Sequence, residues 1–427
     1  MKPFLGSVAF ALAAGAGAQE QPFDAAAFEK KAFELGGYVE LRQEHFTFNR
    51  DGALYQLSPL GAARRAELDR TSGAVQLAGK LRHGIATFDF RTNSSAQHDA
   101  LGEVNRNVLF EGALSLRPAT NLTLEAGKRA LRWGKGYAWN PIGFVERTKD
   151  PNDPNLAREG LWMLDADFIA NPGGALQTLA ITPVLLPVDR HTNADFGAPG
   201  HLNPAVKVYM LLHDVDIDLA WQAKGSRAAR FGMDFAANLA SNFEVHGEWA
   251  RAGRTQQPIV DGAGRVAEST LHPTSWLLGL RYLTERDTTY IAEYYRNGTG
   301  FSAEQLRQFA AFADLAASQS RQGVPGPLQR TVPTALAVYG RPNPGTDYLY
   351  FRAQQKDALG IVYFQPAITA MLNVRDHSWQ MTPELLYTGF DNWELRLRAY
   401  LLRGAGGTDF AEKQNARKLE FYARYYF

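Results

Sequence analysis

Basic and aromatic side chains concentrate in residues 127–154, which read GKRALRWGKGYAWNPIGFVERTKDPNDP. Guanidinium and ammonium groups bind carboxylates and phosphates, and indole or phenol rings can offer flat faces to sugar rings or aromatic acids. The residues that we expect to contact a solute are Lys128, Arg129, Arg132, Trp133, Lys135, Tyr137, Trp139, Arg147 and Lys149. Residues 127–159 carry seven basic and four acidic side chains, so their local charge is three positive.

Two interpretations of these charges are open at the level of sequence. In the first, the basic residues stand in a constriction and raise the local concentration of anions. In the second, they pair with carboxylates of the same wall, for which the candidates are Glu111, Glu125, Asp165 and Asp167. The whole chain has 45 basic and 44 acidic residues, so any charge selectivity has to be local.

Residues 127–154 cannot continue as a β-strand. They are interrupted by Gly134, Gly136, Pro141, Pro151 and Pro154, and proline cannot donate to a strand ladder. Long irregular segments are usually either functional or disordered, and the aromatic residues argue against disorder. We therefore expect a long loop folded into the mouth or lumen of a barrel; the alternative is a surface loop whose rings pack on the rim.

The sequence offers no catalytic constellation. Its nine histidines lack the spacing of metal ligands, and it has no G-x-S-x-G, no phosphate-binding loop and no cysteine. Asp150, Asp153 and Glu159 carry oxygen atoms that suit Ca²⁺, although a solvated turn is the simpler explanation. We expect no enzyme, no metal and no cofactor, and the balanced charge gives no reason to expect nucleic acid.

Alternation of apolar and polar residues dominates the chain from Gly37 onward. In residues 74–82 valine and leucine alternate with glutamine, lysine and arginine, and residues 394–401 repeat the pattern. Such segments are about ten residues long, which is the length that a tilted strand needs to cross a bilayer. No run after the N-terminus approaches the ~18 apolar residues of a membrane helix. The pattern predicts an all-β fold, a transmembrane antiparallel β-barrel; a soluble β-sandwich is the alternative.

Short and long connections alternate along the chain. Tight turns are expected at 118–121, 171–174, 284–287 and 389–392, and longer connections near 50–72, 94–105, 133–159, 185–203, 253–272, 298–346 and 404–416. Short turns on one side and long extracellular loops on the other are typical of outer-membrane barrels. We count about 18 strands, with 16 as the alternative, and a closed barrel of that size encloses water.

Both ends of the chain indicate export to the bacterial outer membrane. Residues 1–18 combine a positive charge, an apolar core and small residues before Gln19, which predicts a signal peptide. Residues 19–35 predict a short periplasmic helix capped at Asp24, and residues 36–427 the barrel. The last ten residues alternate toward Phe427 and resemble the C-terminal signature of bacterial outer-membrane proteins, which implies recognition by the insertion machinery.

The connection at 298–346 contains one regular element. Ser302 and Gln305 form a plausible capping box, and apolar residues then recur at helical spacing, so we expect a helix over residues 301–319. Residues 320–344 are rich in glycine and proline and are expected to be loop. This connection could act as a lid or a docking surface; the simpler interpretation is a helix that shields the rim.

Residues 127–134, GKRALRWG, with the following Asn140-Pro141 resemble the strand end and loop of large porin-like families, among them the alginate-export channels. Lys128 and Arg129 match basic positions of that pattern and Trp133 matches its aromatic position, whereas the acidic motif that follows in the family is missing. The resemblance implies a barrel of about 18 strands whose basic lumen passes an anionic saccharide.

These patterns favour an outer-membrane channel for passive diffusion of small solutes, anionic or saccharide-like, that are filtered at residues 127–154. The expected surroundings are outer-membrane lipid and lipopolysaccharide. The alternative is a barrel that sheathes or docks a partner such as an electron carrier or an exported polymer. Because the chain has no cysteine, any c-type haem would have to come from that partner. The oligomeric state stays open.

Overall fold

The computed structural model describes residues 31–154, 156–323 and 326–427. The expected signal peptide and most of the expected helix in 19–35 lie outside these residues. The described end of that segment is strand, because β1 (Phe33–Phe48) begins at Phe33, before the expected start of the barrel at residue 36.

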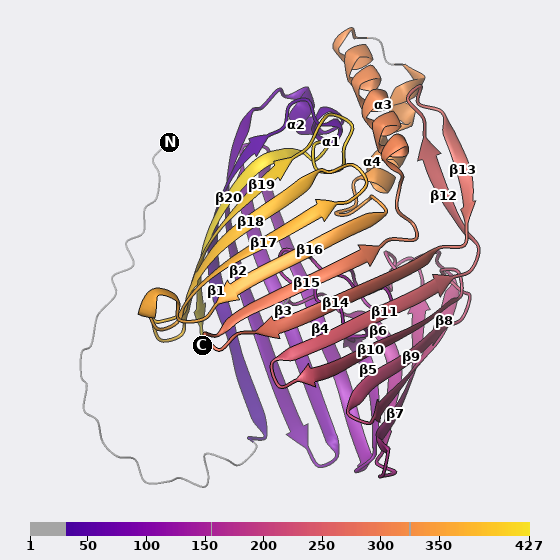
Figure 1. Cartoon of the computed structure of the whole chain (residues 1–427), viewed down its shortest axis with the longest axis vertical. Helices are drawn as coiled ribbons and strands as arrows, with labels where there is room; N and C mark the ends of the chain where they lie inside the picture. Colours follow the sequence, from indigo (N-terminus) through magenta and orange to yellow (C-terminus); the bar gives the residue numbers. More distant parts are fainter. Residues whose placement is uncertain (1–30, 155, 324–325) are drawn as a thin grey trace.

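Eighteen strands of the described part of the chain form one antiparallel sheet (Figure 1). After β1 they are β2 (Glu67–His83), β3 (Ala86–Asp99), β4 (Gly102–Ala119), β5 (Leu122–Arg129), β6 (Leu161–Ala170), β7 (Leu176–Val188), β8 (His201–Leu212), β9 (Val215–Gln222), β10 (Arg230–Ala240), β11 (Phe243–Ala252), β14 (Thr274–Leu283), β15 (Thr288–Arg296), β16 (Asp347–Gln355), β17 (Phe364–Asn373), β18 (Trp379–Tyr387), β19 (Trp393–Arg403) and β20 (Asn415–Tyr426). Because β1 pairs with both β2 and β20, the sheet closes. The predicted barrel of about 18 strands is confirmed.

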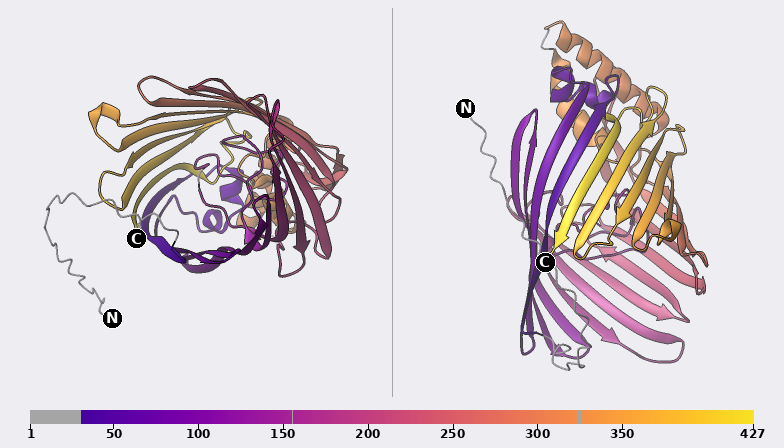
Figure 2. Two further views of the ribbon diagram at one scale, coloured as in Figure 1. Left: turned by 90° about the horizontal axis from the view of Figure 1, so that it is seen from below. Right: turned by 90° about the vertical axis from the view of Figure 1, so that its left-hand side faces the viewer.

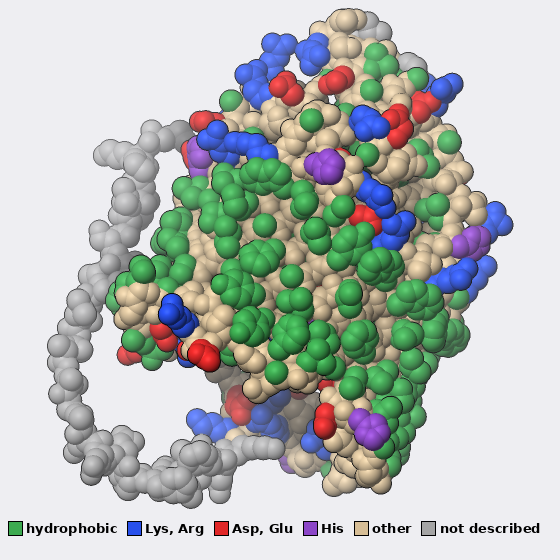
Figure 3. Space-filling view, in the orientation of Figure 1, with side chains coloured by type: hydrophobic (Ala, Val, Ile, Leu, Met, Phe, Trp, Pro, Cys, Tyr) green, Lys and Arg blue, Asp and Glu red, His purple; other side chains and the backbone are tan. Residues whose placement is uncertain are grey.

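The strands turn apolar side chains outward and polar ones inward. On β14, Leu278 and Leu280 are 56% and 38% exposed, whereas the inward-facing Arg398 of β19 is 4% exposed. Figure 3 shows apolar side chains spread over the outer wall. A soluble sandwich would bury that face, so the alternative fold is excluded, and the outward apolar band suits lipid.

The connections divide the barrel into a short-turn end and a long-loop end. The predicted turns at 118–121, 171–174, 284–287 and 389–392 all lie at the short-turn end. The predicted long connection at 94–105 is wrong, because β3 and β4 stay paired up to Asp99 and Gly102. The residues there are polar, but a ladder of backbone hydrogen bonds needs no apolar side chains.

The long-loop end carries helices and a separate hairpin, β12 (Thr255–Val260) with β13 (Val266–Leu271). Helix α3 (Ala303–Arg321) starts at the predicted capping box of Ser302 and Gln305. Residues 320–344 are not all loop, since they contain a 3₁₀ turn, η2 (Pro327–Arg330), and α4 (Val332–Tyr339). Packing outweighs the glycines and prolines there: the ring of Tyr339 stacks on Phe301 and Phe309 at centroid distances of 4.3 and 4.4 Å.

Helix α3 also contacts the loop between β1 and β2, which holds α1 (Ala53–Gln56) and α2 (Pro59–Ala62). The Gln56 amide donates to Asp314 of α3 at 2.8 Å, and the Ala53 N–H donates to Glu412 of the last long loop at 2.7 Å. The first contact ties α3 to the β1–β2 loop, and the second ties that loop to the last long loop. Among the described residues, no helix combines the length and apolar character that crossing a membrane would require.

Placing a charge on the outward face should destabilise the barrel. We expect Leu278→Arg to lower the free energy of unfolding by about 2–4 kcal/mol, the cost of arginine facing lipid near the bilayer midplane. Leu101→Arg at an exposed tight turn serves as the control and should stay within about 0.5 kcal/mol of the parent. Denaturant titrations in lipid vesicles, followed by tryptophan fluorescence, measure both; equal losses would contradict a lipid-facing Leu278.

Candidate functional site

Residues 130–154 and 156–160, which we call the 130–160 segment, leave the wall between β5 and β6 and run through the interior of the barrel. Figure 2 shows this segment inside the ring of strands. Its first part contacts β11 and β15 through Glu248 and Glu293, and its later part reaches β18 and β19 through Asn152 and Asp153. The expected inward-folded loop is therefore present from residue 130 onward, whereas residues 127–129 still belong to β5 and pair with β6. It crosses the lumen from the side of β5 and β6 to the strands from β11 to β19.

Buried carboxylates accept the backbone N–H groups of this segment. Glu248 accepts from Gly136 at 2.6 Å and from Ile142 at 3.1 Å, and Glu293 accepts from Ala138 at 2.9 Å. Both carboxylates are almost fully buried, at 3% and 1% exposure. Charge-assisted bonds of this kind are among the stronger hydrogen bonds in proteins, so they fix the path of the segment.

Glycine is required where the segment approaches the wall. A Cβ at Gly136 would lie 2.1 Å from the carbonyl oxygen of Trp139, and one at Gly134 would lie 2.6 Å from a carboxylate oxygen of Glu248. Gly134 also has a φ of +92°, a conformation that side chains disfavour. The two glycines that end the strand pattern in the sequence therefore permit the close contact with Glu248.

A third carboxylate, Glu146, lies within the segment and connects two parts of it. It accepts the Trp133 N–H at 3.1 Å and forms an ion pair with Arg158 at 2.6 Å. Burial raises the pKa of Glu146, while the charges of Arg158 and Lys149 oppose that shift. Burial also lowers the pKa of Lys149, whose ammonium group donates to the Gly136 carbonyl.

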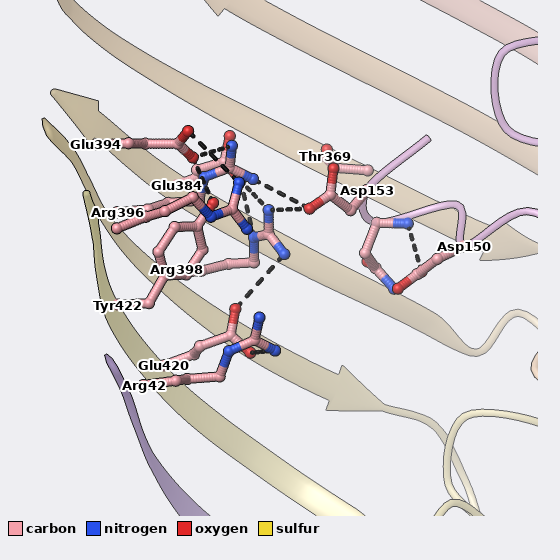
Figure 4. A network of polar contacts seen from close by, with 12 residues as sticks. Arg42, Asp150, Asp153, Thr369, Glu384, Glu394, Arg396, Arg398, Glu420 and Tyr422 are labelled. Atoms are coloured by element: carbon pink, nitrogen blue, oxygen red, sulfur yellow. Dashed lines mark hydrogen bonds and ion pairs between the residues drawn. The ribbon is translucent and has the colours of Figure 1, made fainter. Parts of the chain in front are cut away.

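The later part of the segment meets arginines of β19 (Figure 4). One carboxylate oxygen of Asp153 lies 3.1 Å from Arg396 and 3.3 Å from Arg398, both on β19. These arginines also contact wall carboxylates, with Arg398 at 2.5 Å from Glu384 and Arg396 at 2.9 Å from Glu394. The loop therefore joins an existing network of paired charges.

Neighbouring amides add uncharged contacts. The Gln380 side chain donates to Asn152 at 2.6 Å, and the Thr382 hydroxyl donates to the same oxygen at 3.1 Å. Because Asp153 pairs with arginines and Glu159 with a lysine, these carboxylates do not form the Ca²⁺ site considered from the sequence. No group of three or more metal-ligating side chains occurs among the described residues.

Most of the predicted basic residues are paired with carboxylates. Lys128 lies 2.6 Å from Glu159, Arg129 lies 2.5 Å from Asp165 and also contacts Glu125. Within the segment, Lys135 lies 3.1 Å from Asp218 on β9. The second interpretation of the charges, pairing within the barrel, is thus the observed one for these three residues.

Arg147 is paired as well, because it contacts Asp195 in the loop after β7 and lies 3.7 Å from Glu159. Arg132 is exposed and makes none of the hydrogen bonds or ion pairs found in the described residues.

The predicted aromatic residues are used for packing. Trp133 is 2% exposed and lies in a core cluster with Phe144 and wall residues of β6 and β7. Trp139 is 6% exposed and stacks on Tyr295 at a centroid distance of 4.9 Å. Tyr137 meets the ring of His246 edge-on at 5.3 Å. Trp133 is covered by protein, whereas Trp139 lies at the lining of the outer cavity although only 6% of it is exposed.

Two cavities lie on opposite sides of the segment. The outer cavity, about 460 Å³, is lined by the segment and by residues of the long-loop end such as Asp195, Arg227 and Thr299. The inner cavity, about 530 Å³, is lined by Tyr137, by the Asp153 network and by residues near the short turns. The segment therefore stands between a space that faces the long loops and a space that faces the short turns.

The outer cavity contains arginines without a carboxylate partner. Arg227 and Arg230 form none of the ion pairs found in the described residues, and the Nε of Arg230 has no hydrogen-bond partner there. The cross-strand neighbour of Arg230 is Gln222, a fully buried residue whose amide atoms also lack partners. Burial lowers the pKa of Arg227 to about 10, and the nearby charges of Arg230 and Arg147 act in the same direction.

Sequence reasoning missed several of these residues. Arg396 and Arg398 lie on the polar face of the alternating segment 394–401, so the pattern placed them on the inner wall without indicating their contact with the loop. Glu248, Glu293, Arg227 and Arg230 gave no local signal that distinguished them from other polar wall residues.

The comparisons with known proteins support the fold. No protein-family model matches the chain, and no curated protein matches it either. Among solved structures, the chain is similar to OccAB1 of Acinetobacter baumannii, with a TM-score of 0.55 and 11% identity over 92% of this chain and 96% of that one.

Two structures from Pseudomonas aeruginosa are also similar at 10% identity. OccK5 (OpdH) has a TM-score of 0.52 over 92% of this chain and 98% of that chain, and OprD has 0.51 over 93% and 97%. These neighbours are outer-membrane β-barrels of the OprD/Occ porins. The resemblance to alginate-export channels is not supported by these comparisons. At such low identity the similarity establishes the barrel fold.

Removing the two wall carboxylates should release the segment. We expect Glu248→Ala with Glu293→Ala to remove four hydrogen bonds from backbone N–H groups, each worth about 1.5–3 kcal/mol because the acceptor is charged. Limited proteolysis of the folded, heat-modifiable barrel should then cut within residues 130–160 at least several-fold faster. Glu103→Ala, an exposed carboxylate outside the lumen contacts, is the control. Unchanged cleavage in the double variant would show that other contacts hold the segment.

Proposed function

We propose that the protein is a bacterial outer-membrane channel for passive diffusion of small solutes, with residues 130–160 as its constriction. The observation that carries this proposal is the closed barrel whose polar interior is crossed by a segment tied to β11, β15 and β19. A barrel of about 18 strands is too wide for side chains alone to fill. An inward loop anchored at Glu248, Glu293 and Asp153 is a suitable means of narrowing it.

A preference for anions is the finer part of the proposal. The lining of the outer cavity includes five basic residues and two acidic ones, a difference of three positive charges. The lining of the inner cavity includes four basic residues and two acidic ones, a difference of two. The inner arginines Arg396 and Arg398 are paired with carboxylates, so the outer cavity is the side that favours anionic solutes.

The character of the unpaired cations supports the same preference. Burial is the main reason that the pKa of Arg227 is lowered, and the charge of Arg230 adds to that shift. An anion in the outer cavity would offset the like charges and could accept the hydrogen bond that the Nε of Arg230 does not make within the described residues. A preference for saccharides has less support, because Trp133 is buried in a packed cluster and Trp139 is stacked on Tyr295.

Channel activity and the role of Asp153 can be tested together in planar bilayers. We expect discrete conductance steps with anion preference in a KCl gradient, and a larger preference in Asp153→Asn, since the substitution removes one negative charge beside Arg396 and Arg398. A change of about 1 kcal/mol in local potential, typical of a charge at a few Å in water, corresponds to about a five-fold change in ion ratio. Asp391→Asn in a short turn is the control.

Two results would contradict the proposal at different points. Conductance without a shift of the reversal potential in Asp153→Asn would support a channel, but it would show that Asp153 does not influence which ions pass. A folded, heat-modifiable barrel without conductance would show that the lumen is closed, and a barrel that docks a partner would become the better explanation.

The outer cavity gives a separate prediction. We expect Arg227→Gln with Arg230→Gln to reduce the anion preference, because two of the five basic side chains of the cavity lose their charge while hydrogen-bonding groups remain. Arg254→Gln, an exposed arginine at the same rim, serves as the control. Reversal potentials at low salt measure the effect, which should fade at 1 M salt, where the Debye length is about 3 Å. An equal effect of Arg254→Gln would assign the preference to the rim as a whole.

A further inference from the structure

The turn between β16 and β17, residues 356–363, exposes large apolar side chains at the short-turn end. Leu359 is 89% exposed, and Ile361, Val362 and Tyr363 are 48%, 59% and 55% exposed. Figures 1 and 2 show this turn projecting sideways from the wall near the C-terminus. It is longer than the other connections that the structure describes at that end. Closing the hairpin does not require such a turn, because the neighbouring hairpins close with fewer residues.

The turn has a defined shape. Its two ends are bonded to the adjacent turns, since the Lys356 N–H donates to Asp287 at 3.2 Å and the Thr388 N–H donates to Tyr363 at 3.3 Å. Asp357 accepts the Tyr363 N–H at 2.6 Å and so closes the turn internally. Asp357, Leu359 and Tyr363 have φ values of 48°, 59° and 65°, which cost free energy in residues other than glycine. The backbone is thus held in a costly conformation that presents apolar side chains outward.

The surface beside the turn has the character of a membrane interface. Aromatic pairs face outward on the neighbouring strands, with Tyr290 and Phe351 at a centroid distance of 6.1 Å and Trp393 and Tyr425 at 5.2 Å. Phe390 in the next turn is 58% exposed. Aromatic side chains of this kind form belts at the edges of the apolar band in outer-membrane barrels. The apolar tip of the turn is therefore continuous with the lipid-facing surface.

We propose that Leu359, Ile361, Val362 and Tyr363, with Phe390, insert into the lipid of the periplasmic leaflet and anchor the barrel at that depth. The inference depends on the proposed function only in placing the barrel in a membrane. Lipid fits better than a second copy of the chain, because a stable protein interface takes about 20–30 residues from each partner. A turn of eight residues that stands out from the wall offers far less, yet its apolar tip suits insertion among acyl chains.

Because the sequence contains no cysteine, a single introduced cysteine can be labelled specifically to test this proposal. Leu359→Cys and Val362→Cys, each labelled with a nitroxide, are reconstituted in phosphatidylethanolamine–phosphatidylglycerol vesicles, and collisions with oxygen and with a water-soluble nickel chelate are compared by electron paramagnetic resonance. Leu385→Cys on the lipid-facing side of β18 is the lipid control, and Glu285→Cys in the adjacent short turn is the water control. We expect the oxygen-to-nickel ratio at 359 and 362 to approach that at 385 and to exceed that at 285 several-fold.

Three results would overturn the inference. A ratio at 359 equal to that at 285 would place the tip in water. Low accessibility to both reagents, or spin–spin broadening that grows with the protein-to-lipid ratio, would show that protein covers the tip, as in contact with a second copy. A water-like ratio at 385 as well would show that the barrel wall is not in lipid, which refutes the membrane placement itself and not the turn alone.

Discussion

The structure depends on complete pairing of the wall's backbone. Lipid offers no hydrogen-bond partner, so a sheet that crosses a membrane has to close on itself. Here β1 pairs with β20 from Tyr38 opposite Tyr426 to Thr47 opposite Arg417, and the two ends of the chain thereby complete the ring. Once closure of the barrel has given the backbone groups of the strands their hydrogen-bond partners, the side chains can differ between the two faces of the sheet. Apolar residues turn outward, and charged residues that a soluble protein would place on its surface line the interior.

The backbone N–H groups of a segment inside such a barrel do not pair with a neighbouring strand. They therefore need other hydrogen-bond acceptors. The wall supplies their acceptors as carboxylates, chiefly Glu248 and Glu293. Burying a carboxylate is costly unless it gains several hydrogen bonds, and each of these two accepts at least two from the segment. Wall and segment therefore stabilise each other. The same argument explains why glycine stands at 134 and 136, where the backbone comes close to Glu248.

The fold could be predicted because its signals are local and repeated. Alternation in segments such as 394–401 indicates both the strands and the face that meets lipid, and the capping box at Ser302 locates α3. The contacts of the constriction could not be predicted, since Gly136 and Glu248 are 112 residues apart in sequence and many wall positions carry similar carboxylates. Trp133 illustrates a second reason why the site could not be predicted. A tryptophan side chain can pack in a core or bind a solute, and its role depends on neighbours that the sequence does not reveal.

The pairing of charges distinguishes the two sides of the constriction. Around Asp153 the arginines lie within hydrogen-bond distance of carboxylates, so their fields largely cancel beyond a few Å and the contacts act mainly to hold the segment in place. Arg227 and Arg230 have no such partners in the described residues, so their fields extend toward the long-loop end over about a Debye length, roughly 8–10 Å at moderate salt. In the proposed channel, selection by charge therefore takes place mainly in the outer cavity. Selection by size takes place where the segment meets β18 and β19.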